Sequence, residues 1–252
     1  MTELQIHQWL VLLMFALASQ SFVLLLLVNA PYGRFARPGW GPTLSARSAW
    51  IIFESPAVVV FAGVYVSGDN AMTTVPLILF CLWQFHYVVR TLVFPIRMRE
   101  TGKRTPVLIV ALAIVLNVLN SYLNARWISH LGEYPLNWLT SGPFMAGVLL
   151  FIAGWSINQH ADRTLFRLRK PGETGYKIPH GGLYRWVSCP NYLGEIVQWL
   201  GWAVATWSLA GAAFAVLTMA NLLPRAIAIH RWYRTQFADY PKSRHAVFPY
   251  VV

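Results

Sequence analysis

Long hydrophobic runs separated by short polar segments dominate this chain. A helix that crosses the hydrocarbon core of a bilayer needs about 20 mostly apolar residues, and about 17 to 25 are tolerated. Runs near that length cover roughly residues 9–28, 50–66, 75–94, 107–123, 142–160, 193–207 and 210–230. The pattern predicts an all-α membrane protein with seven transmembrane helices.

The last two runs form one apolar stretch that is too long for a single crossing. Residues 208–211, with the sequence SLAG, contain the small residues expected at a tight reversal. We therefore expect two helices joined by a turn there. Residues 1–8 contain no Lys or Arg, unlike the start of a signal peptide, so the first run is expected to remain as a helix.

Composition agrees with a membrane protein. Hydrophobic residues make up 56% of the chain and charged residues 12%, and the mean hydropathy is +0.47. The 12 Trp residues suit the two membrane interfaces. A net charge of +11 could indicate nucleic acid, but the basic residues lie between apolar runs and form no stripe. We expect no nucleic-acid partner.

The basic residues instead predict an orientation. Apart from Arg90 and Arg126, every Lys and Arg lies in the first, third or fifth loop between runs, or near the C-terminus. The positive-inside rule therefore places the C-terminus in the cytosol and the N-terminus outside. Such a basic rim could also attract an anionic cytosolic ligand, such as a dinucleotide, although orientation alone would explain the charge.

Two ionisable residues, Glu54 and Arg90, fall inside predicted spans, where an unpaired charge costs at least about 2.5 to 3.5 kcal/mol. Helical spacing allows Tyr87 and His86 to share a face with Arg90. One interpretation is a structural ion pair between Glu54 and Arg90. The other is a site that faces an interior cavity.

The chemistry available to Glu54 and Tyr87 suits a reaction in which an oxygen gains negative charge. Reduction of an enone delivers hydride to the β carbon while the ketone oxygen becomes anionic. A Tyr hydroxyl can donate a hydrogen bond to that oxygen, and a buried neutral Glu can donate a second. No side chain carries hydride, so the sequence predicts a redox cofactor.

Polar residues near the cytosolic ends of the later runs could hold this cofactor without a Rossmann domain, because no G-x-G-x-x-G follows a strand. Asn158 and Asp162 are four residues apart and precede Arg169, and Asn191 and Glu195 are also four apart. Each pair lies on one helical face. Alternatively, Asn191 and Glu195 are a helix cap and a first-turn acid.

The remaining reactive residues show no site of their own. Cys81 and Cys189 have no metal-type spacing, so we expect neither a disulfide framework nor a metal site. From its position alone, Arg225 beside Pro224 could be a snorkelling interface residue.

Several segments resemble the steroid 5α-reductase family. They are RKPGETGYKIP at 169–179, GGL at 181–183, NYLGE at 191–195, ATWSL at 205–209 and DYPKSR at 239–244. The N-terminal half matches more thinly, at 32–34, 49–50, Glu54 with Pro56, 86–87 and 90–91. The resemblance extends over nearly the whole chain.

The resemblance implies a seven-helix fold in which NADPH enters from the cytosol and reduces a Δ4-3-ketosteroid or a similar enone. Hydride would reach C5 and a proton C4. Residues 1–252 would form one transmembrane domain, with the substrate pocket in about 1–125 and the NADPH site in about 140–252. We expect a monomer surrounded by lipid, in the endoplasmic reticulum of a eukaryote or the inner membrane of a bacterium.

The resemblance also implies roles for individual residues. Glu54 and Tyr87 would polarise the ketone, with Trp50 and Phe53 beside the substrate. The implied dinucleotide ligands are Arg90, Asn158, Asp162, Arg169, Tyr176, Asn191, Arg225 and Tyr233. The chain departs from the family at Phe53, where the mammalian enzymes have Gln, and at Ile229, where a family His is replaced and His230 is adjacent.

Two other functions remain open from sequence. One is a membrane methyltransferase of the isoprenylcysteine type, but its S-adenosylmethionine has no phosphates to match the basic rim. The other is a small transporter or lipid-binding protein with Glu54 and Arg90 as a gate. No inverted repeat supports transport.

Overall fold

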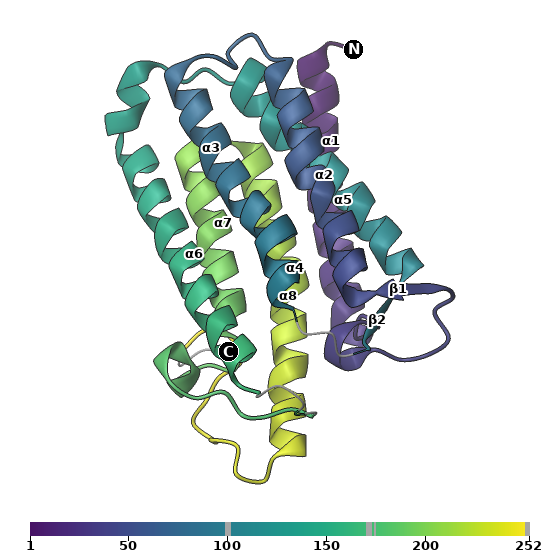
Figure 1. The fold of residues 1–252 in the computed structure, drawn as a ribbon. Coiled ribbons are helices and arrows are strands. Elements are labelled where there is room, and N and C mark those ends of the chain that lie inside the picture. The colour runs from purple at the N-terminus through teal and green to yellow at the C-terminus, as the bar shows by residue number, and fades with distance from the viewer. Residues whose placement is uncertain (99–101, 170–172, 174, 250–252) are drawn as a thin grey trace.

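A computed structural model describes residues 1–98, 102–169, 173 and 175–249 of the chain (Figure 1). It is a bundle of long helices with one small hairpin at one end. The long helices are α1 (Glu3–Leu27), α2 (Ala46–Val66), α3 (Thr74–Val88), α5 (Val107–Arg126), α6 (Gly142–Arg167), α7 (Pro190–Thr206) and α8 (Leu209–Gln236).

Short elements extend or connect these helices. The π-helical turn η2 (Val89–Val93) and α4 (Phe94–Arg97) continue α3, and the π-helical turn η3 (Trp127–Leu131) continues α5. Short 3-10 helices are η1 (Gly33–Phe35), η4 (Leu136–Thr140) and η5 (Gly182–Arg185). Strands β1 (Thr43–Ser45) and β2 (Arg104–Pro106) pair antiparallel, with Thr43 opposite Pro106.

The mostly helical fold confirms the all-α class, and a helix occupies each of the seven predicted positions. Within the described residues, five helical segments are long and apolar enough to cross a membrane: Glu3–Leu27, Ala46–Val66, Thr74–Arg97, Val107–Leu131 and Leu209–Gln236. The chain is therefore an integral membrane protein. Helices α6 and α7 are not in that set, and α7 is only 17 residues long.

The turn between α7 and α8 is tighter than predicted. Trp207 alone takes the left-handed conformation, with φ 45° and ψ 43°. Ser208 is the N-cap of α8, and its side chain accepts a hydrogen bond from the Gly211 N–H at 2.9 Å. The prediction of a turn over 208–211 is wrong beyond Ser208, because a Ser cap starts the new helix at once.

Aromatic side chains fill the centre of the bundle. Trp83 of α3 contacts Phe61 of α2 with ring centroids 4.3 Å apart, and it also contacts Trp199 and Trp202 of α7. All four rings are almost fully buried. Helix α1 lies outside this core and packs against α5 and α8. The core therefore joins α2, α3 and α7, the helices that carry most of the candidate site.

Helices α6 and α7 lie side by side (Figure 1) along a seam of glycines. Gly147 and Gly154 of α6 face Gly194 and Gly201 of α7. A Cβ added at Gly154 would lie 2.3 Å from the backbone nitrogen of Gln198. The two backbones are thus in direct contact, as small residues permit between helices in membranes.

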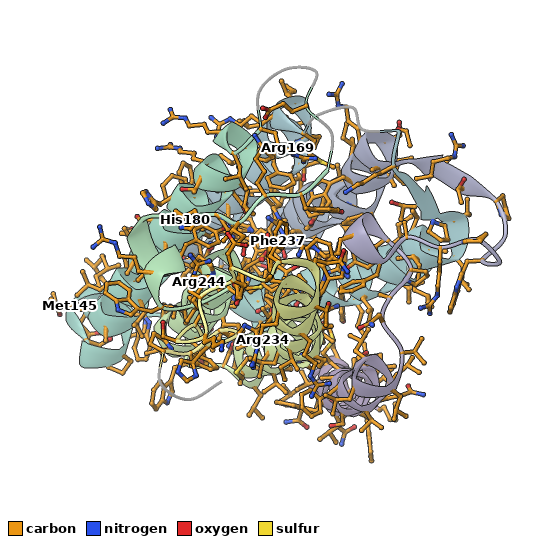
Figure 2. All side chains as sticks on the ribbon, turned by 90° about the horizontal axis from the view of Figure 1, so that it is seen from below. Met145, Arg169, His180, Arg234, Phe237 and Arg244 are labelled. Carbon is orange, nitrogen blue, oxygen red and sulfur yellow. The ribbon has the colours of Figure 1, made fainter. Side chains whose placement is uncertain are left out.

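The hairpin, the C-terminal ends of α6 and α8, and the C-terminal segment lie at one end of the bundle, and the N-terminus lies at the other (Figure 1). Figure 2, seen from below, shows Arg169, His180, Arg234 and Arg244 at the first end. The loops that sequence analysis found to be basic therefore meet on one side of the molecule.

The glycine seam gives a stability prediction. Gly154→Val should lower the free energy of unfolding by about 1 to 3 kcal/mol, because its Cβ would overlap the α7 backbone. Thermal unfolding in detergent measures this change. Gly63→Val is the matched control, since an added Cβ there meets no atom within 4 Å. Equal unfolding temperatures for the two variants would contradict the close packing.

Candidate active site

The turn of α2 that carries Glu54 is shaped by Pro56. Proline has no N–H, so the Ile52 carbonyl loses its partner in the helix. The Ser55 hydroxyl donates to that carbonyl at 2.9 Å and replaces the missing bond. Glu54 sits within this altered turn and is 8% exposed.

Helix α5 holds the same turn from the side. The Asn117 amide donates to the Phe53 carbonyl at 2.6 Å, and the Ser121 hydroxyl donates to the Pro56 carbonyl at 3.3 Å. Hydrogen bonds between helices have few competitors in the hydrocarbon interior, where water is absent. They therefore fix the backbone on both sides of Glu54.

Arg90 lies in the π-helical turn η2, a rare geometry that often marks functional positions. The Trp50 indole N–H donates to the Arg90 carbonyl at 3.0 Å. The Arg90 guanidinium lies over the rings of Trp50 and Phe94, with its central carbon 4.7 and 5.0 Å from their centroids. Aromatic faces thus cover the cation without neutralising it.

Three carboxyl groups from three helices surround that guanidinium. Its closest partner is Glu195 of α7, with Nη2 and Oε1 2.8 Å apart. Nε lies 3.5 Å from Oε1 of Glu54, and Nη1 lies 3.9 Å from Oδ2 of Asp162. The predicted pair of Glu54 and Arg90 is therefore part of a cluster of four charged groups.

Asn191 connects Asp162 to Asn158. The Asn191 amide donates to Oδ1 of Asp162 at 3.2 Å, and the Asn158 amide donates to the Asn191 carbonyl at 3.0 Å. Asn191 is not a helix cap, because α7 begins at Pro190 with Cys189 as its N-cap residue. Three predicted cofactor residues therefore form one network that reaches Arg90.

Tyr87 lies beside the same cluster, one turn before Arg90. It is 4% exposed, and its ring contacts Trp83 and Trp199 at centroid distances of 4.9 and 5.6 Å. The Tyr87 hydroxyl lies close enough to Arg90, Glu54 and Glu195 for their charges to act on it. Its hydroxyl makes no hydrogen bond within the described residues. The structure thus brings Glu54 and Tyr87 to one buried site.

The two other residues predicted near the substrate also lie here. Phe53 contacts Trp50 with ring centroids 5.1 Å apart. The Arg90 guanidinium lies against one face of the Trp50 ring, so this ring covers the charge cluster.

Toward the basic end, Arg34 is surrounded by three aromatic rings. Its guanidinium carbon lies 4.3, 4.5 and 4.8 Å from the centroids of Trp232, Tyr233 and Tyr176. Arg34 also donates to the Tyr233 hydroxyl at 3.2 Å. Tyr233 and Tyr176, predicted to hold the dinucleotide, thus come together around a residue that sequence analysis did not select.

Arg225 is likewise engaged by the first loop. Its guanidinium carbon lies 3.9 Å from the centroid of the Tyr32 ring, and its Nε donates to the Tyr192 hydroxyl at 3.0 Å. These contacts hold the guanidinium against groups of the protein, which a snorkelling residue would not require. Arg225 instead joins α8 to the first loop and to α7.

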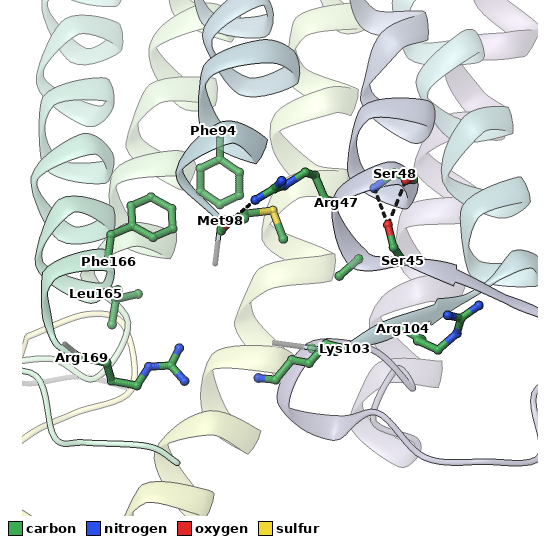
Figure 3. Close-up of a pocket in the computed structure, with 13 residues that line it drawn as sticks. Ser45, Arg47, Ser48, Phe94, Met98, Lys103, Arg104, Leu165, Phe166 and Arg169 are labelled. Carbon is green, nitrogen blue, oxygen red and sulfur yellow. Dashed lines mark hydrogen bonds between the residues drawn. The ribbon is translucent and has the colours of Figure 1, made fainter. Parts of the chain in front are cut away.

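A cavity of about 680 Å³ opens at the basic end (Figure 3). Its lining includes the cations Arg47, Lys103, Arg104 and Arg169 and the rings of Phe94 and Phe166. Arg169 and Lys103 reach toward it from opposite sides in Figure 3. This set of several cations and aromatic faces fits a ligand with phosphate groups and flat rings.

Sequence analysis counted Arg47 and Lys103 in basic loops but did not place them in a site. The pairing of β1 with β2 brings their loops together. Lys103 donates to the Tyr176 hydroxyl at 2.5 Å, and Arg47 donates to the Met98 carbonyl at 2.7 Å. Of the family-like segments, residues 170–172 and 174 lie outside the described residues, as does Arg99 of the third loop.

The cysteines take no part in this site. Cys81 and Cys189 are both free. Burial raises the pKa of the Cys189 thiol to about 12, so it stays protonated at neutral pH and is a poor nucleophile.

Comparison with known proteins now decides the family. Residues 103–252 match the family model described as 3-oxo-5-alpha-steroid 4-dehydrogenase. The chain belongs to this family. It is similar to the steroid 5-alpha-reductase DET2 of Gossypium hirsutum, with 43% identity over 95% of both chains. The DET2 of Arabidopsis thaliana is 45% identical over 91% of this chain and 90% of its own.

An animal relative shows the same extent of similarity. The 3-oxo-5-alpha-steroid 4-dehydrogenase 1 of Bos taurus is 42% identical over 94% of this chain and 93% of its own. The resemblance to the 5α-reductases is therefore confirmed, and the chain is an oxidoreductase of steroid metabolism. The comparisons give no support to the methyltransferase or the transporter.

The charge cluster gives a stability prediction. Arg90→Met should lower the free energy of unfolding by about 3 to 5 kcal/mol, because it leaves buried carboxyl groups without their cation. Thermal unfolding in detergent measures this loss. Arg126→Met is the matched control, because its partner Glu3 is 42% exposed and such pairs contribute about 0 to 1 kcal/mol. Similar losses in both variants would refute the role of Arg90.

Proposed function

We propose that this protein uses NADPH to reduce the Δ4 double bond of a 3-oxo steroid, or of a similar enone lipid, to the 5α product. Family membership supports the reaction class. The observation that carries the mechanism is the shared location of Glu54 and Tyr87 in a buried cluster that Arg90 connects to Asp162.

In this proposal Tyr87 and Glu54 act on the ketone oxygen of the substrate. The Tyr87 hydroxyl donates a hydrogen bond to that oxygen, and Glu54 in its acid form donates a second. Both bonds strengthen as the oxygen becomes anionic, so they stabilise the transition state more than the bound substrate. Their burial removes water that would otherwise compete for the oxygen.

Arg90 serves this arrangement by holding the carboxyl groups at fixed positions. Its shortest contact is to Glu195, so the side chain stays anchored even when Glu54 is protonated. Glu195 is therefore the main counter-ion of Arg90, and Glu54 remains free to donate a hydrogen bond toward the substrate.

The C-terminal half would hold the cofactor. When bound, NADPH would supply the hydride for C5 and become NADP⁺, and the proton for C4 would come from water. We assign cofactor contacts to the predicted residues Arg90, Asn158, Asp162, Arg169, Tyr176, Asn191, Arg225 and Tyr233, and add Arg34, Arg47 and Lys103 from the basic end. The cations suit the phosphates of the dinucleotide, including the 2′-phosphate.

We further propose that α6 and α7 complete seven crossings, with the N-terminus outside and the C-terminus in the cytosol. The glycine seam supports their membrane location, and the collected basic loops support the orientation. The chain would be one domain, in which residues 1–125 supply the substrate side and 140–252 the NADPH side. A monomer in the endoplasmic reticulum or a bacterial inner membrane fits this topology.

Loss of either donor should abolish most turnover while NADPH binding persists. We expect Tyr87→Phe and Glu54→Gln each to lower kcat about 100-fold or more, because one donor to the developing oxyanion is lost or weakened. The measurement is loss of NADPH absorbance in detergent with progesterone or testosterone. Parental turnover by either variant would remove that residue from the mechanism.

Tyr65→Phe is the matched control for Tyr87→Phe. Tyr65 is also a buried phenol, but its hydroxyl donates to the Ala71 carbonyl at 2.6 Å, away from the charge cluster. This variant should keep parental kcat per folded molecule.

The cofactor assignment is tested at Arg169. Arg169→Ala should weaken NADPH binding about tenfold or more, since a hydrogen bond to a charged group contributes about 1.5 to 3 kcal/mol. The dissociation constant is measured by the fluorescence of reduced nicotinamide. Exposed Arg185, in η5 at the same basic end, supplies the control Arg185→Ala. If both variants bind NADPH with the parental constant, Arg169 is not part of the site.

A further inference from the structure

We propose that Gln198 of α7 is a positioning residue for Tyr87 and that it acts through His86. This inference rests on the proposed function, because it concerns how the Tyr87 hydroxyl is aimed at the substrate oxygen. Gln198 belongs to none of the residue sets assigned above, and nothing in its sequence spacing had distinguished it.

A buried hydrogen bond joins the two helices at this point. Nε2 of Gln198 lies 2.7 Å from Nδ1 of His86. Gln198 is 0% exposed and His86 is 3% exposed, so no water competes for the bond. The Gln198 amide donates and His86 accepts, which leaves the imidazole neutral with its proton on Nε2.

This bond is one of two polar contacts that α7 makes with α3 and its continuation η2, and they lie on either side of Tyr87 in the sequence. Three residues before Gln198 on α7, Glu195 pairs with Arg90 at 2.8 Å. Arg90 lies four residues after His86 on the other helix. Because residues three or four apart share a helical face, the two contacts lock the rotation of α3 about its axis. Tyr87, adjacent to His86, turns with that helix.

Ring packing transmits the position of His86 to Tyr87. The His86 ring meets the Tyr87 ring edge to face, with centroids 4.9 Å apart and planes at 84°. It meets the Trp199 ring in the same way, at 4.8 Å and 77°. Trp199 in turn contacts Tyr87 at 5.6 Å. The three rings form a triangle, so His86 cannot shift without moving the phenol.

Gln198 also keeps a polar atom without a partner. Its Oε1 is buried and has no hydrogen-bond partner within the described residues. An apolar residue would avoid that cost in a bundle core, and buried polar groups that are not fully satisfied call for a functional reason. Control of the His86 ring supplies such a reason. Without the bond from Gln198, the ring could rotate, or Nδ1 could carry the proton in place of Nε2.

A double-mutant cycle tests this role. Gln198→Met keeps the side-chain length but removes the donor, and it should lower kcat on the order of tenfold, because small displacements of a catalytic group are costly. The Kd for NADPH should stay at the parental value. In the Tyr87→Phe background the same substitution should lower kcat by less than about twofold, because the hydroxyl that it aims is already gone.

The control removes a similar contact that lies elsewhere on α7. The Trp202 indole donates to Oδ1 of buried Asn124 at 2.8 Å. Asn124→Leu should lower the unfolding temperature, but it should change kcat by the same factor with Tyr or Phe at position 87. This comparison separates positioning from a general loss of stability.

Three results would overturn the proposal. An unchanged kcat in Gln198→Met shows that the contact has no role, and an equal loss of kcat in both backgrounds shows a structural role only. Parental turnover by Tyr87→Phe removes Tyr87 from the mechanism, and the positioning role falls with it; only this last result also contradicts the proposed function. If Gln198→Met does not fold, Gln198→Asn, which is too short to reach His86, carries the same expectations.

Discussion

A single guanidinium surrounded by three buried carboxyl groups is the interaction on which the rest of the structure depends. A buried charge is expensive in a membrane interior, so the guanidinium of Arg90 stays there only because the carboxyl groups of Glu54, Asp162 and Glu195 are held around it. Each carboxyl group comes from a different helix, α2, α6 or α7. The cluster therefore fixes how four helices pack, and it places a proton-bearing group beside Tyr87.

The backbone is adapted to that requirement at several places. Pro56 removes a backbone N–H from α2 next to Glu54, and a π-helical turn follows α3 at Arg90. Glycines such as Gly154 and Gly194 let α6 and α7 approach until their polar residues share one network. A proline is tolerated inside α2 because a neighbouring side chain, the Ser55 hydroxyl, donates to the Ile52 carbonyl that Pro56 leaves without a partner.

Much of this arrangement could be predicted from the sequence. Hydrophobic runs gave the helices, and the motifs around Asn191 and Glu54 gave the family. The side chains that pair with a buried charged residue were harder to predict. A sequence pattern gives the spacing of residues within one helix but not the contacts between helices. Glu195 was considered as a cofactor-site residue or a first-turn acid but not as the partner of Arg90, and Lys103 only as a charge in a loop. The left-handed backbone conformation of Trp207 was not predictable either, since no rule based on residue spacing places a Trp in that conformation.

In the proposed mechanism, hydride from NADPH reaches C5 of a steroid whose ketone oxygen is bound by Glu54 and Tyr87. The most direct measurement is product analysis after turnover of testosterone with NADPH that carries deuterium in the transferred position. We expect one deuterium at C5 of a 5α-reduced product. A reduced steroid without deuterium, or with deuterium at a carbon other than C5, would contradict it.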